Sequence, residues 1–128
     1  MNINSEGNYR KEKISLHSII SGLNLQIIYM PQDSKEIFIK SKKINRPGLN
    51  LVGFYNDFDP DRIQIIGSSE YRYLLTLSME ERKKALKLFF SHKPSVVMVT
   101  KKLNLDNDII QIAKEYKVPL LKIEVDTS

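Results

Sequence analysis

Apolar side chains recur along the second half of this chain in the two rhythms that distinguish strands from helices. Residues 62–67, 95–100 and 119–123 are short runs rich in isoleucine, valine and leucine, and each predicts a strand. The run at 95–100 is apolar almost without a break, as in a strand that is buried on both faces. The segments between these strands carry apolar residues three or four positions apart, which predicts helices. Residues 62–123 therefore predict a βαβαβ unit with parallel strands and right-handed crossovers.

Polar residues indicate where each of these helices begins. The candidate N-caps are Ser68 and Ser69 for the first helix, Ser78 for the second, and Asp106 or Asn107 for the third. Ser78 is followed three residues later by Glu81, which is the pattern of a capping box. The side chains expected to face the core are Tyr71, Leu74 and Leu75 of the first helix, Leu86, Phe89 and Phe90 of the second, and Ile109, Ile110, Ile112 and Ala113 of the third.

The first half predicts one helix and shorter strands. The helix would begin after Ser15, carry Leu16, Ile19, Ile20 and Leu23 on one side, and end near Gly22. Strands are expected at residues 25–30, closed by a proline, and at 36–40. Residues 41–62 are otherwise irregular, and within them residues 49–54 alternate enough to predict a third strand.

These elements predict an α/β fold in a single domain, with a mixed, mostly parallel sheet and a C-terminal βαβαβ unit flanked by helices. Residues 1–13 are polar and are expected to form a flexible N-terminal arm, and residues 14–128 to form the domain. The size of 128 residues and the 41% share of hydrophobic residues fit one domain with a core of its own.

Composition narrows the class of protein. The chain has no cysteine, which excludes a disulfide scaffold and a thiolate metal site. It has no apolar run of about 18 residues, and its first 14 residues lack the apolar stretch of a signal peptide. We therefore expect a cytoplasmic protein without a membrane partner.

The formal net charge of +5 would suit a nucleic-acid partner. Lysines are spread along the chain and alternate with acidic residues, which is typical of a solvated surface. No nucleic-acid-binding motif accompanies the charge. We expect no nucleic-acid partner.

The sequence contains no known catalytic motif. The glycines are Gly7, Gly22, Gly48, Gly53 and Gly67. Gly48 and Gly53 have the spacing of a P-loop, but Phe54 and Tyr55 follow where a lysine and a serine or threonine are needed to hold phosphates. A dinucleotide-binding fingerprint and a Gly-x-Ser-x-Gly nucleophile elbow are also absent from the sequence.

Metal-ligating patterns are absent as well. His17 and His92 lie far apart in the sequence, and neither has a ligand pattern beside it. Asp57, Asp59 and Asp61 alternate as in a calcium loop, but the positions that need glycine and glutamate hold Arg62 and Ser68. We expect no catalytic residue, no cofactor and no metal in this chain.

The carboxyl ends of the parallel strands are the first candidate for a ligand site, since ligands of open α/β sheets gather there. The residues at those ends that could form an anion or ligand site are Ser68, Ser69, Glu70, Thr100, Lys101 and Lys102. Backbone N–H groups at a helix start attract anions, and the two lysines would add positive charge. The alternative is ordinary helix capping beside a solvated pair of lysines.

A second candidate is a contact surface for a partner, made by Arg46, Tyr55 and Phe58. Pro47 fixes the backbone beside Arg46, and Gly48 would allow a turn with positive φ that presents the guanidinium. Arg46 could equally pair with an internal carboxylate. Aromatic side chains are enriched in protein interfaces, but those of the loop could instead close the edge of the core.

Two segments of the chain resemble one protein family. Residues 46–54 read Arg-Pro-Gly-Leu-Asn-Leu-Val-Gly-Phe, and residues 62–70 read Arg-Ile-Gln-Ile-Ile-Gly-Ser-Ser-Glu. Together with Tyr73-Leu74 and residues 94–100 and 118–121, they resemble the N-terminal domain of HPr kinase/phosphorylase. The resemblance covers residues 14–127. It implies a fold similar to the N-terminal domain of the Mur ligases.

The resembled enzymes phosphorylate a serine of HPr, the phosphocarrier of the bacterial sugar phosphotransferase system, with ATP, and remove the phosphate by phosphorolysis. In that family the P-loop, the acid and base residues, and hence ATP and Mg²⁺, belong to a C-terminal domain that does not lie within these 128 residues. The resemblance therefore implies a regulatory or assembly domain that is not itself an enzyme and that takes part in carbon catabolite repression. Its expected partners are a C-terminal kinase domain and further copies of itself, with HPr as another candidate. The alternative is a sensor of a nucleotide or a phosphorylated metabolite.

Overall fold

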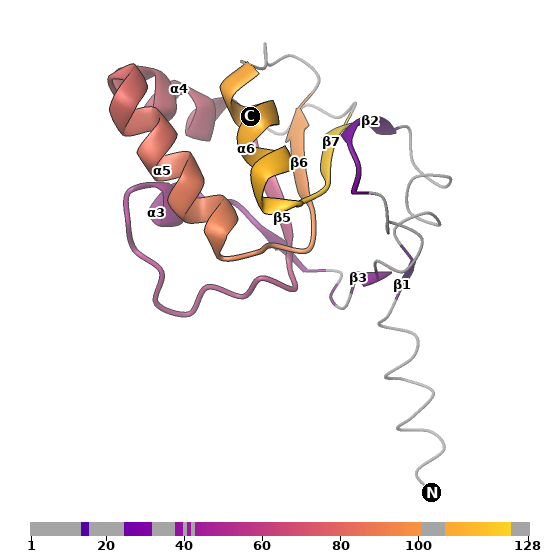
Figure 1. Cartoon of the computed structure of the whole chain (residues 1–128). Helices are drawn as coiled ribbons and strands as arrows, with labels where there is room; N and C mark the ends of the chain where they lie inside the picture. The colour runs from indigo at the N-terminus through magenta and orange to yellow at the C-terminus, as the bar shows by residue number, and fades with distance from the viewer. Residues whose placement is uncertain are drawn as a thin grey trace, which may run out of the picture.

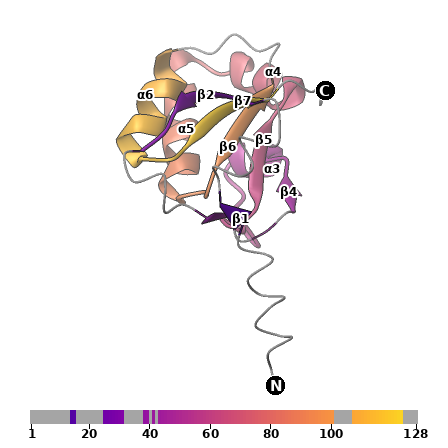
Figure 2. The ribbon, with the colours of Figure 1, turned by 90° about the vertical axis from the view of Figure 1, so that its right-hand side faces the viewer.

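The computed structural model describes residues 14–15, 25–31, 38–39, 41, 43–100 and 107–123. Its centre is a five-stranded sheet with the strand order β2-β7-β6-β5-β4 (Figures 1 and 2). The strands are β2 (Leu25–Tyr29), β4 (Ile44–Asn45), β5 (Ile63–Ile66), β6 (Val97–Thr100) and β7 (Leu120–Ile123). The strands β4 to β7 run parallel, whereas β2 pairs antiparallel with β7. The predicted α/β fold with a mixed, mostly parallel sheet is confirmed.

Four helices are described: α3 (Gly48–Leu51), α4 (Ser68–Thr76), α5 (Met79–Ser91) and α6 (Asn107–Tyr116). α5 and α6 lie side by side over one face of the sheet (Figure 2). The helix α5 begins as predicted, because the Ser78 hydroxyl accepts a hydrogen bond of 3.1 Å from the Glu81 N–H. The βαβαβ unit of the second half is therefore present.

The predicted N-cap of α4 is wrong. Gly67 is the N-cap, and Ser68 and Ser69 lie inside the first turn of the helix. The buried Glu70 carboxylate accepts a hydrogen bond of 2.8 Å from the Gly67 N–H. A glutamate three positions after the N-cap accepts from the N-cap N–H, which is one half of a capping box and needs no serine at the N-cap.

The core is divided between the two faces of the sheet, because alternate residues of a strand point to opposite sides. Val97 and Val99 of β6 belong to the larger cluster, which also contains side chains of all four helices. Met98 of β6 belongs to a smaller cluster on the other face. The predicted inward residues Leu86, Phe89 and Phe90 are at most 3% exposed. Leu75 was expected to be buried and is instead 50% exposed.

The first half contains strands that were expected and some that were not. β2 matches the strand predicted over residues 25–30, and β3 (Phe38–Ile39) lies within the strand predicted over 36–40. The unpredicted strand β1 (Ile14–Ser15) pairs antiparallel with β3, so Ser15 lies in a strand. The helix predicted after Ser15, and the arm predicted over residues 1–13, lie outside the described residues.

The strand predicted over residues 49–54 is wrong. β4 and β5 are parallel neighbours, so the chain between them must cross back from the end of one to the start of the other. The segment forms the short helix α3 and then a long loop that returns to β5. In a strand Leu49 and Leu51 would share one face, whereas here Leu51 is buried and Leu49 is 68% exposed, because a helix turn points residues two apart in different directions.

Candidate functional site

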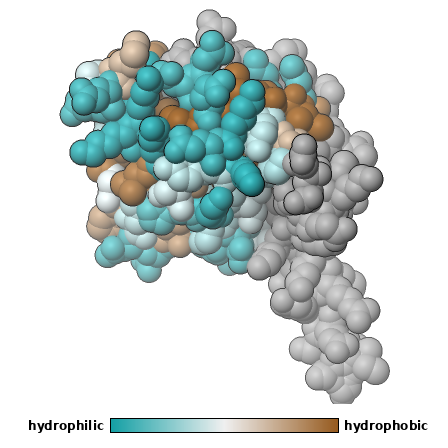
Figure 3. Space-filling view, in the orientation of Figure 1, coloured by the Kyte–Doolittle hydropathy of each residue, from teal (hydrophilic) through white to brown (hydrophobic). Residues whose placement is uncertain are grey.

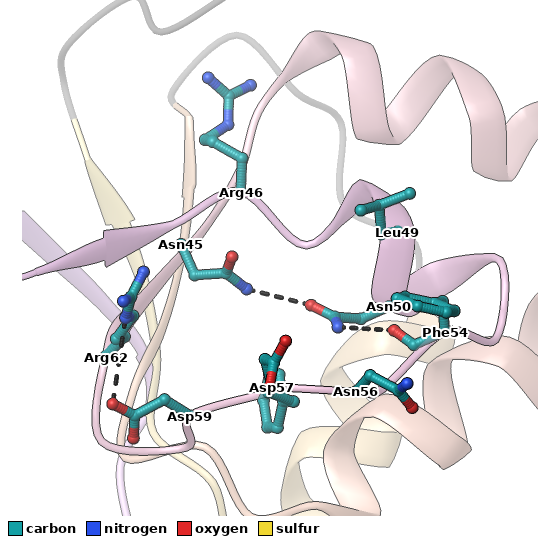
Figure 4. A pocket seen from close by; sticks show the side chains of 10 residues that line it. Asn45, Arg46, Leu49, Asn50, Phe54, Asn56, Asp57, Asp59 and Arg62 are labelled. Atoms are coloured by element: carbon teal, nitrogen blue, oxygen red, sulfur yellow. Dashed lines mark hydrogen bonds and ion pairs between the residues drawn. The ribbon is translucent and has the colours of Figure 1, made fainter.

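The crossover between β4 and β5 holds a chain of side-chain amides, of which Asn50 and Gln64 are buried and Asn45 is half-buried. Asn45 at the end of β4 donates from Nδ2 to Gln64 Oε1 of β5 at 2.7 Å and to Asn50 Oδ1 of α3 at 3.0 Å. Asn50 donates in turn from Nδ2 to the Phe54 carbonyl at 3.0 Å (Figure 4). Gln64 is fully buried and donates to the carbonyls of Arg62, at 3.2 Å, and Asp59. These bonds, which we call the amide network, fix α3 and the returning loop to the sheet.

Two backbone hydrogen bonds around Gly53 end the helix α3. The Gly53 N–H donates to the Asn50 carbonyl at 2.9 Å, and the Phe54 N–H donates to the Leu49 carbonyl at 3.0 Å. Gly53 has a φ of 106°. Two such bonds around a glycine with positive φ form a Schellman motif. The glycine with positive φ is thus Gly53, and the expectation that Gly48 supplies such a turn is wrong, since Gly48 opens α3.

Arg46 pairs with an internal carboxylate. Its Nη2 lies 2.8 Å from Oε1 of Glu70, the same oxygen that accepts the Gly67 N–H. The Glu70 side chain is 6% exposed, and the Arg46 side chain is 38% exposed. A backbone donor and a guanidinium beside a buried carboxylate offset the free-energy cost of removing its charge from water. The pair joins the end of β4 to the start of α4.

A pocket of about 330 Å³ lies between α3 and the returning loop. It is bordered by Asn45, Arg46, Leu49, Asn50, Phe54, Asn56, Asp57, Phe58, Asp59 and Arg62. Figure 4 shows the Asp57 carboxylate pointing from the loop toward the hydrogen bond between Asn45 and Asn50, whereas the Arg46 guanidinium points away from Asp57 and Asp59. Both segments with the family resemblance contribute to this pocket, which sequence reasoning did not locate.

The remaining predicted partner contacts, Tyr55 and Phe58, pack against the core. The Tyr55 ring stacks on His92 with centroids 3.9 Å apart and an angle of 1° between the rings. The Phe58 ring meets Phe89 edge-on at 6.0 Å. Both side chains are partly buried, whereas the neighbouring Phe54 is 53% exposed. His92 itself is the C-cap of α5. A partner contact through Arg46, Tyr55 or Phe58 stays a prediction.

The Tyr55 hydroxyl is buried without a hydrogen-bond partner, and burial raises the pKa of this phenol to about 12. We expect Tyr55→Phe to preserve or raise the stability at neutral pH, by up to about 1 kcal/mol, since a buried polar group without a partner destabilises the fold. Folded Tyr55 keeps its proton above pH 10 while the unfolded chain loses it, so Tyr55 should lower the stability as the pH rises from 10 to about 12.

Urea unfolding at neutral pH and across the alkaline range measures both effects for wild type and variant. The stability difference should grow in favour of Tyr55→Phe above pH 10. A variant that is less stable than wild type at neutral pH would show that the hydroxyl has a stabilising role.

The candidate anion site is only partly described. Ser68 is partly buried, Ser69 is exposed, and Thr100 is buried at the end of β6. Lys101 and Lys102 lie outside the described residues. Glu70, the last member, is engaged with Arg46 and Gly67. An anion site at the strand ends stays a prediction.

No three histidine, aspartate or glutamate side chains in the described part of the chain lie together as a metal site, and Asp57, Asp59 and Asp61 do not form one. No described helix is long and apolar enough to cross a membrane.

Comparison with solved structures shows the fold again. The chain superimposes with a TM-score of 0.62 on a structure of the CBS and DRTGG domains of the regulatory region of Clostridium perfringens pyrophosphatase, complexed with the activator diadenosine tetraphosphate. The match covers 93% of this chain and 45% of that one, at 18% sequence identity. At 18% identity the match is evidence for a shared fold.

Comparison of sequences gives the family. The chain is 32% identical over 115 residues to the HPr kinase/phosphorylase of Clostridium perfringens, and the match covers 90% of this chain and 37% of the relative. It is 36% identical over 110 residues to the HPr kinase/phosphorylase of Caldicellulosiruptor bescii, covering 86% of this chain and 35% of that protein. The chain thus spans little more than a third of the length of these relatives. Since residues 14–128 match the family described as HPr Serine kinase N terminus, the chain belongs to that family.

Proposed function

We propose that this chain is the non-catalytic regulatory and assembly domain of a bifunctional HPr serine kinase/phosphorylase in the bacterial phosphotransferase system, where it serves carbon catabolite repression. The family membership and the matched 37% of the C. perfringens relative support this role. ATP and Mg²⁺ would be bound by a kinase domain outside these residues, and the protein would act in the cytoplasm.

The observation that carries the non-catalytic role is the engagement of Arg46 and Asn50 in the first family segment and of Gln64 and Glu70 in the second. Arg46 is paired with Glu70, and Asn45, Asn50 and Gln64 bond to one another and to backbone carbonyls. A catalytic site needs polar groups that are free to meet a substrate within hydrogen-bond reach. Here these side chains hold β4, α3, α4 and β5 in place. The sequence also lacks the glycine-rich loop that cradles phosphates in P-loop kinases.

An assembly role is supported by the two edges of the five-stranded sheet. β2 and β4 are its outer strands, and Ile27 of β2 and Ile44 of β4 are 47% and 54% exposed. Edge strands with exposed apolar side chains favour pairing with another chain. On the face seen in Figure 3, hydrophobic side chains lie in separate patches among hydrophilic ones. The proposed partners are a second copy of this chain and a kinase domain, with HPr as a further candidate.

Two measurements test the role. The isolated chain, incubated with labelled ATP, Mg²⁺ and HPr, should transfer no phosphate to HPr. In a chimera, this chain replaces the matching N-terminal region of the C. perfringens relative. Its kinase and phosphorylase rates and its mass by sedimentation equilibrium are compared with those of the intact relative and of the relative lacking that region.

The chimera should resemble the intact relative in mass and in the balance of the two rates, and the truncated relative should not. Phosphate transfer by the isolated chain would overturn the non-catalytic role. A truncated relative with unchanged rates and mass would overturn the regulatory and assembly role.

A second candidate function is that of a sensor for a nucleotide or a phosphorylated metabolite at the carboxyl ends of the strands. It is favoured by the shared fold with a pyrophosphatase regulatory region whose structure contains diadenosine tetraphosphate. Such a ligand should raise the melting temperature of the chain, because binding to the folded state stabilises it. Lys101→Ala should abolish that rise.

A further inference from the structure

The pocket between α3 and the returning loop has the properties of a small-molecule site. Its volume of about 330 Å³ lies within the range of about 300–1,000 Å³ that is usual for such sites. One wall is held by the amide network, in which the Nδ2 groups of Asn45 and Asn50 already donate to other parts of the chain. A wall fixed in this way keeps its shape without a ligand, so binding does not have to order it.

Other polar groups at the pocket are still available to a ligand. Within the described part of the chain, the side chains of Asn56 and Asp57 have no hydrogen-bond or ion-pair partner. Arg62 Nε is buried without a hydrogen-bond partner and lies 3.9 Å from Asp59 Oδ2, too far for a hydrogen bond. A buried N–H donor without an acceptor is rare in folded proteins and calls for a specific explanation. The Arg62 side chain as a whole is 40% exposed, so its terminal N–H groups, rather than the buried Nε–H, are within reach of a bound molecule.

Asp57 has an unusual backbone. Its φ of 64° is in the left-handed region, which aspartate enters at a lower cost than most residues other than glycine. Figure 4 shows that its carboxylate is directed into the pocket rather than to solvent on the far side of the loop. The conformation therefore supplies the pocket with a free acceptor group.

The charges at the pocket select the class of ligand. Asp57 and Asp59 contribute two carboxylates and Arg62 one guanidinium, while the Arg46 guanidinium is paired with Glu70 outside the group. An excess of negative charge disfavours a phosphate or carboxylate ligand, and the guanidinium disfavours a cation. Groups that both donate and accept hydrogen bonds suit a carboxylate beside a guanidinium, and hydroxyls have that property.

An exposed aromatic ring completes the pattern. Phe54 is 53% exposed at the border of the pocket and offers an apolar surface beside the polar groups. Pockets with apolar and aromatic walls and a few polar groups bind molecules that present both kinds of surface. We propose that this pocket binds an uncharged polyhydroxylated molecule of monosaccharide size, with hydroxyls on Asp57 and Arg62 and its C–H face toward Phe54. This site lies beyond the proposed assembly role and does not depend on it.

The test uses the full chain and three probes: a set of neutral sugars (glucose, fructose and ribose), glucose 6-phosphate, and putrescine. Each is titrated to about 10 mM, since weak sites need millimolar ligand to stabilise the fold measurably. The melting temperature and the arginine Nε–H signals in ¹H–¹⁵N NMR spectra are followed. A neutral sugar should raise the melting temperature with saturation and shift the Arg62 Nε–H signal.

Variants make the test specific. Asp57→Asn keeps a residue that tolerates the left-handed backbone but removes the charge, and it should weaken sugar binding by about tenfold, as the loss of one good hydrogen bond would. Asp61→Asn makes the same change in the same loop at a residue that does not border the pocket, and it should leave binding unchanged. The proposal is overturned if no neutral sugar binds, if glucose 6-phosphate or putrescine binds more tightly than every neutral sugar, or if the two variants behave alike.

Discussion

Asn50→Asp is expected to lower the free energy of unfolding by about 3 kcal/mol at neutral pH, the sum expected for an unsatisfied carbonyl and a buried charge. Asn50 is 8% exposed, and its Nδ2 is the donor to the Phe54 carbonyl. An aspartate keeps the acceptor for Asn45 but cannot donate to Phe54 when ionised. The substitution therefore removes one bond of the amide network and places a negative charge in the crossover.

The loss of stability caused by Asn50→Asp should grow as the pH rises. Burial disfavours the ionised form, so the new carboxyl has a higher pKa in the folded chain than in the unfolded chain. Between those two pKa values the folded state binds more protons, and the stability of the variant relative to wild type falls as the pH rises. At a pH below the unfolded value of about 3.9 both states are protonated, and the difference should shrink to that of an altered hydrogen bond.

Asn56→Asp is the matched control. Asn56 is exposed in the same loop, and an exposed carboxylate has little effect on stability. Urea unfolding of both variants across the acidic and neutral range measures the effect. Equal stabilities for Asn50→Asp and Asn56→Asp at neutral pH would show that the amide network does not hold the crossover.

The second half of the fold could be predicted from sequence because its signals are local. The Ser78 cap and the Leu86, Phe89 and Phe90 stripe each depend on residues within a few positions. The run at 95–100 is apolar because β6 lies inside the sheet, between β5 and β7. Local propensity and the final packing agree in these elements, so reading the sequence leads to the right structure.

The crossover between β4 and β5 could not be predicted in the same way. Asn45 and Gln64 are 19 positions apart in the sequence, so their hydrogen bond appears only once β4 and β5 are paired. In the sequence these amides look like loop residues or the polar face of a strand. The network joins the two segments with the family resemblance through Asn45, since Asn50 belongs to the first segment and Gln64 to the second.

Arg46 shows the same limit at the candidate site. The sequence left two alternatives for this residue, a partner contact or an internal ion pair, because Glu70 lies 24 positions away. Only the pairing of β4 with β5 brings the end of β4 close to the start of α4. The pocket could not be predicted for a related reason, since its walls come from β4, α3 and a loop whose path depends on Gly53.

Gly53→Ala is expected to lower the free energy of unfolding by about 2 kcal/mol, the penalty of a left-handed backbone for a residue with a Cβ. Gly53 has a φ of 106°, and a Cβ built on it would meet no atom within 4 Å. Steric contact with the rest of the protein is thus excluded, and the whole effect comes from the backbone. If the chain relaxes instead, it must give up the two hydrogen bonds that end α3.

Gly48→Ala separates this backbone effect from the general effect of adding a methyl group. A Cβ at Gly48 also meets no atom within 4 Å, and Gly48 is not among the residues with positive φ. Because alanine favours a helix over glycine, Gly48→Ala should leave stability unchanged or raise it by up to about 0.5 kcal/mol. Thermal or urea unfolding of the two variants measures the contrast. A similar loss in both would mean that α3 tolerates no side chain at either end, and no loss in either would mean that the Schellman motif does not fix the returning loop.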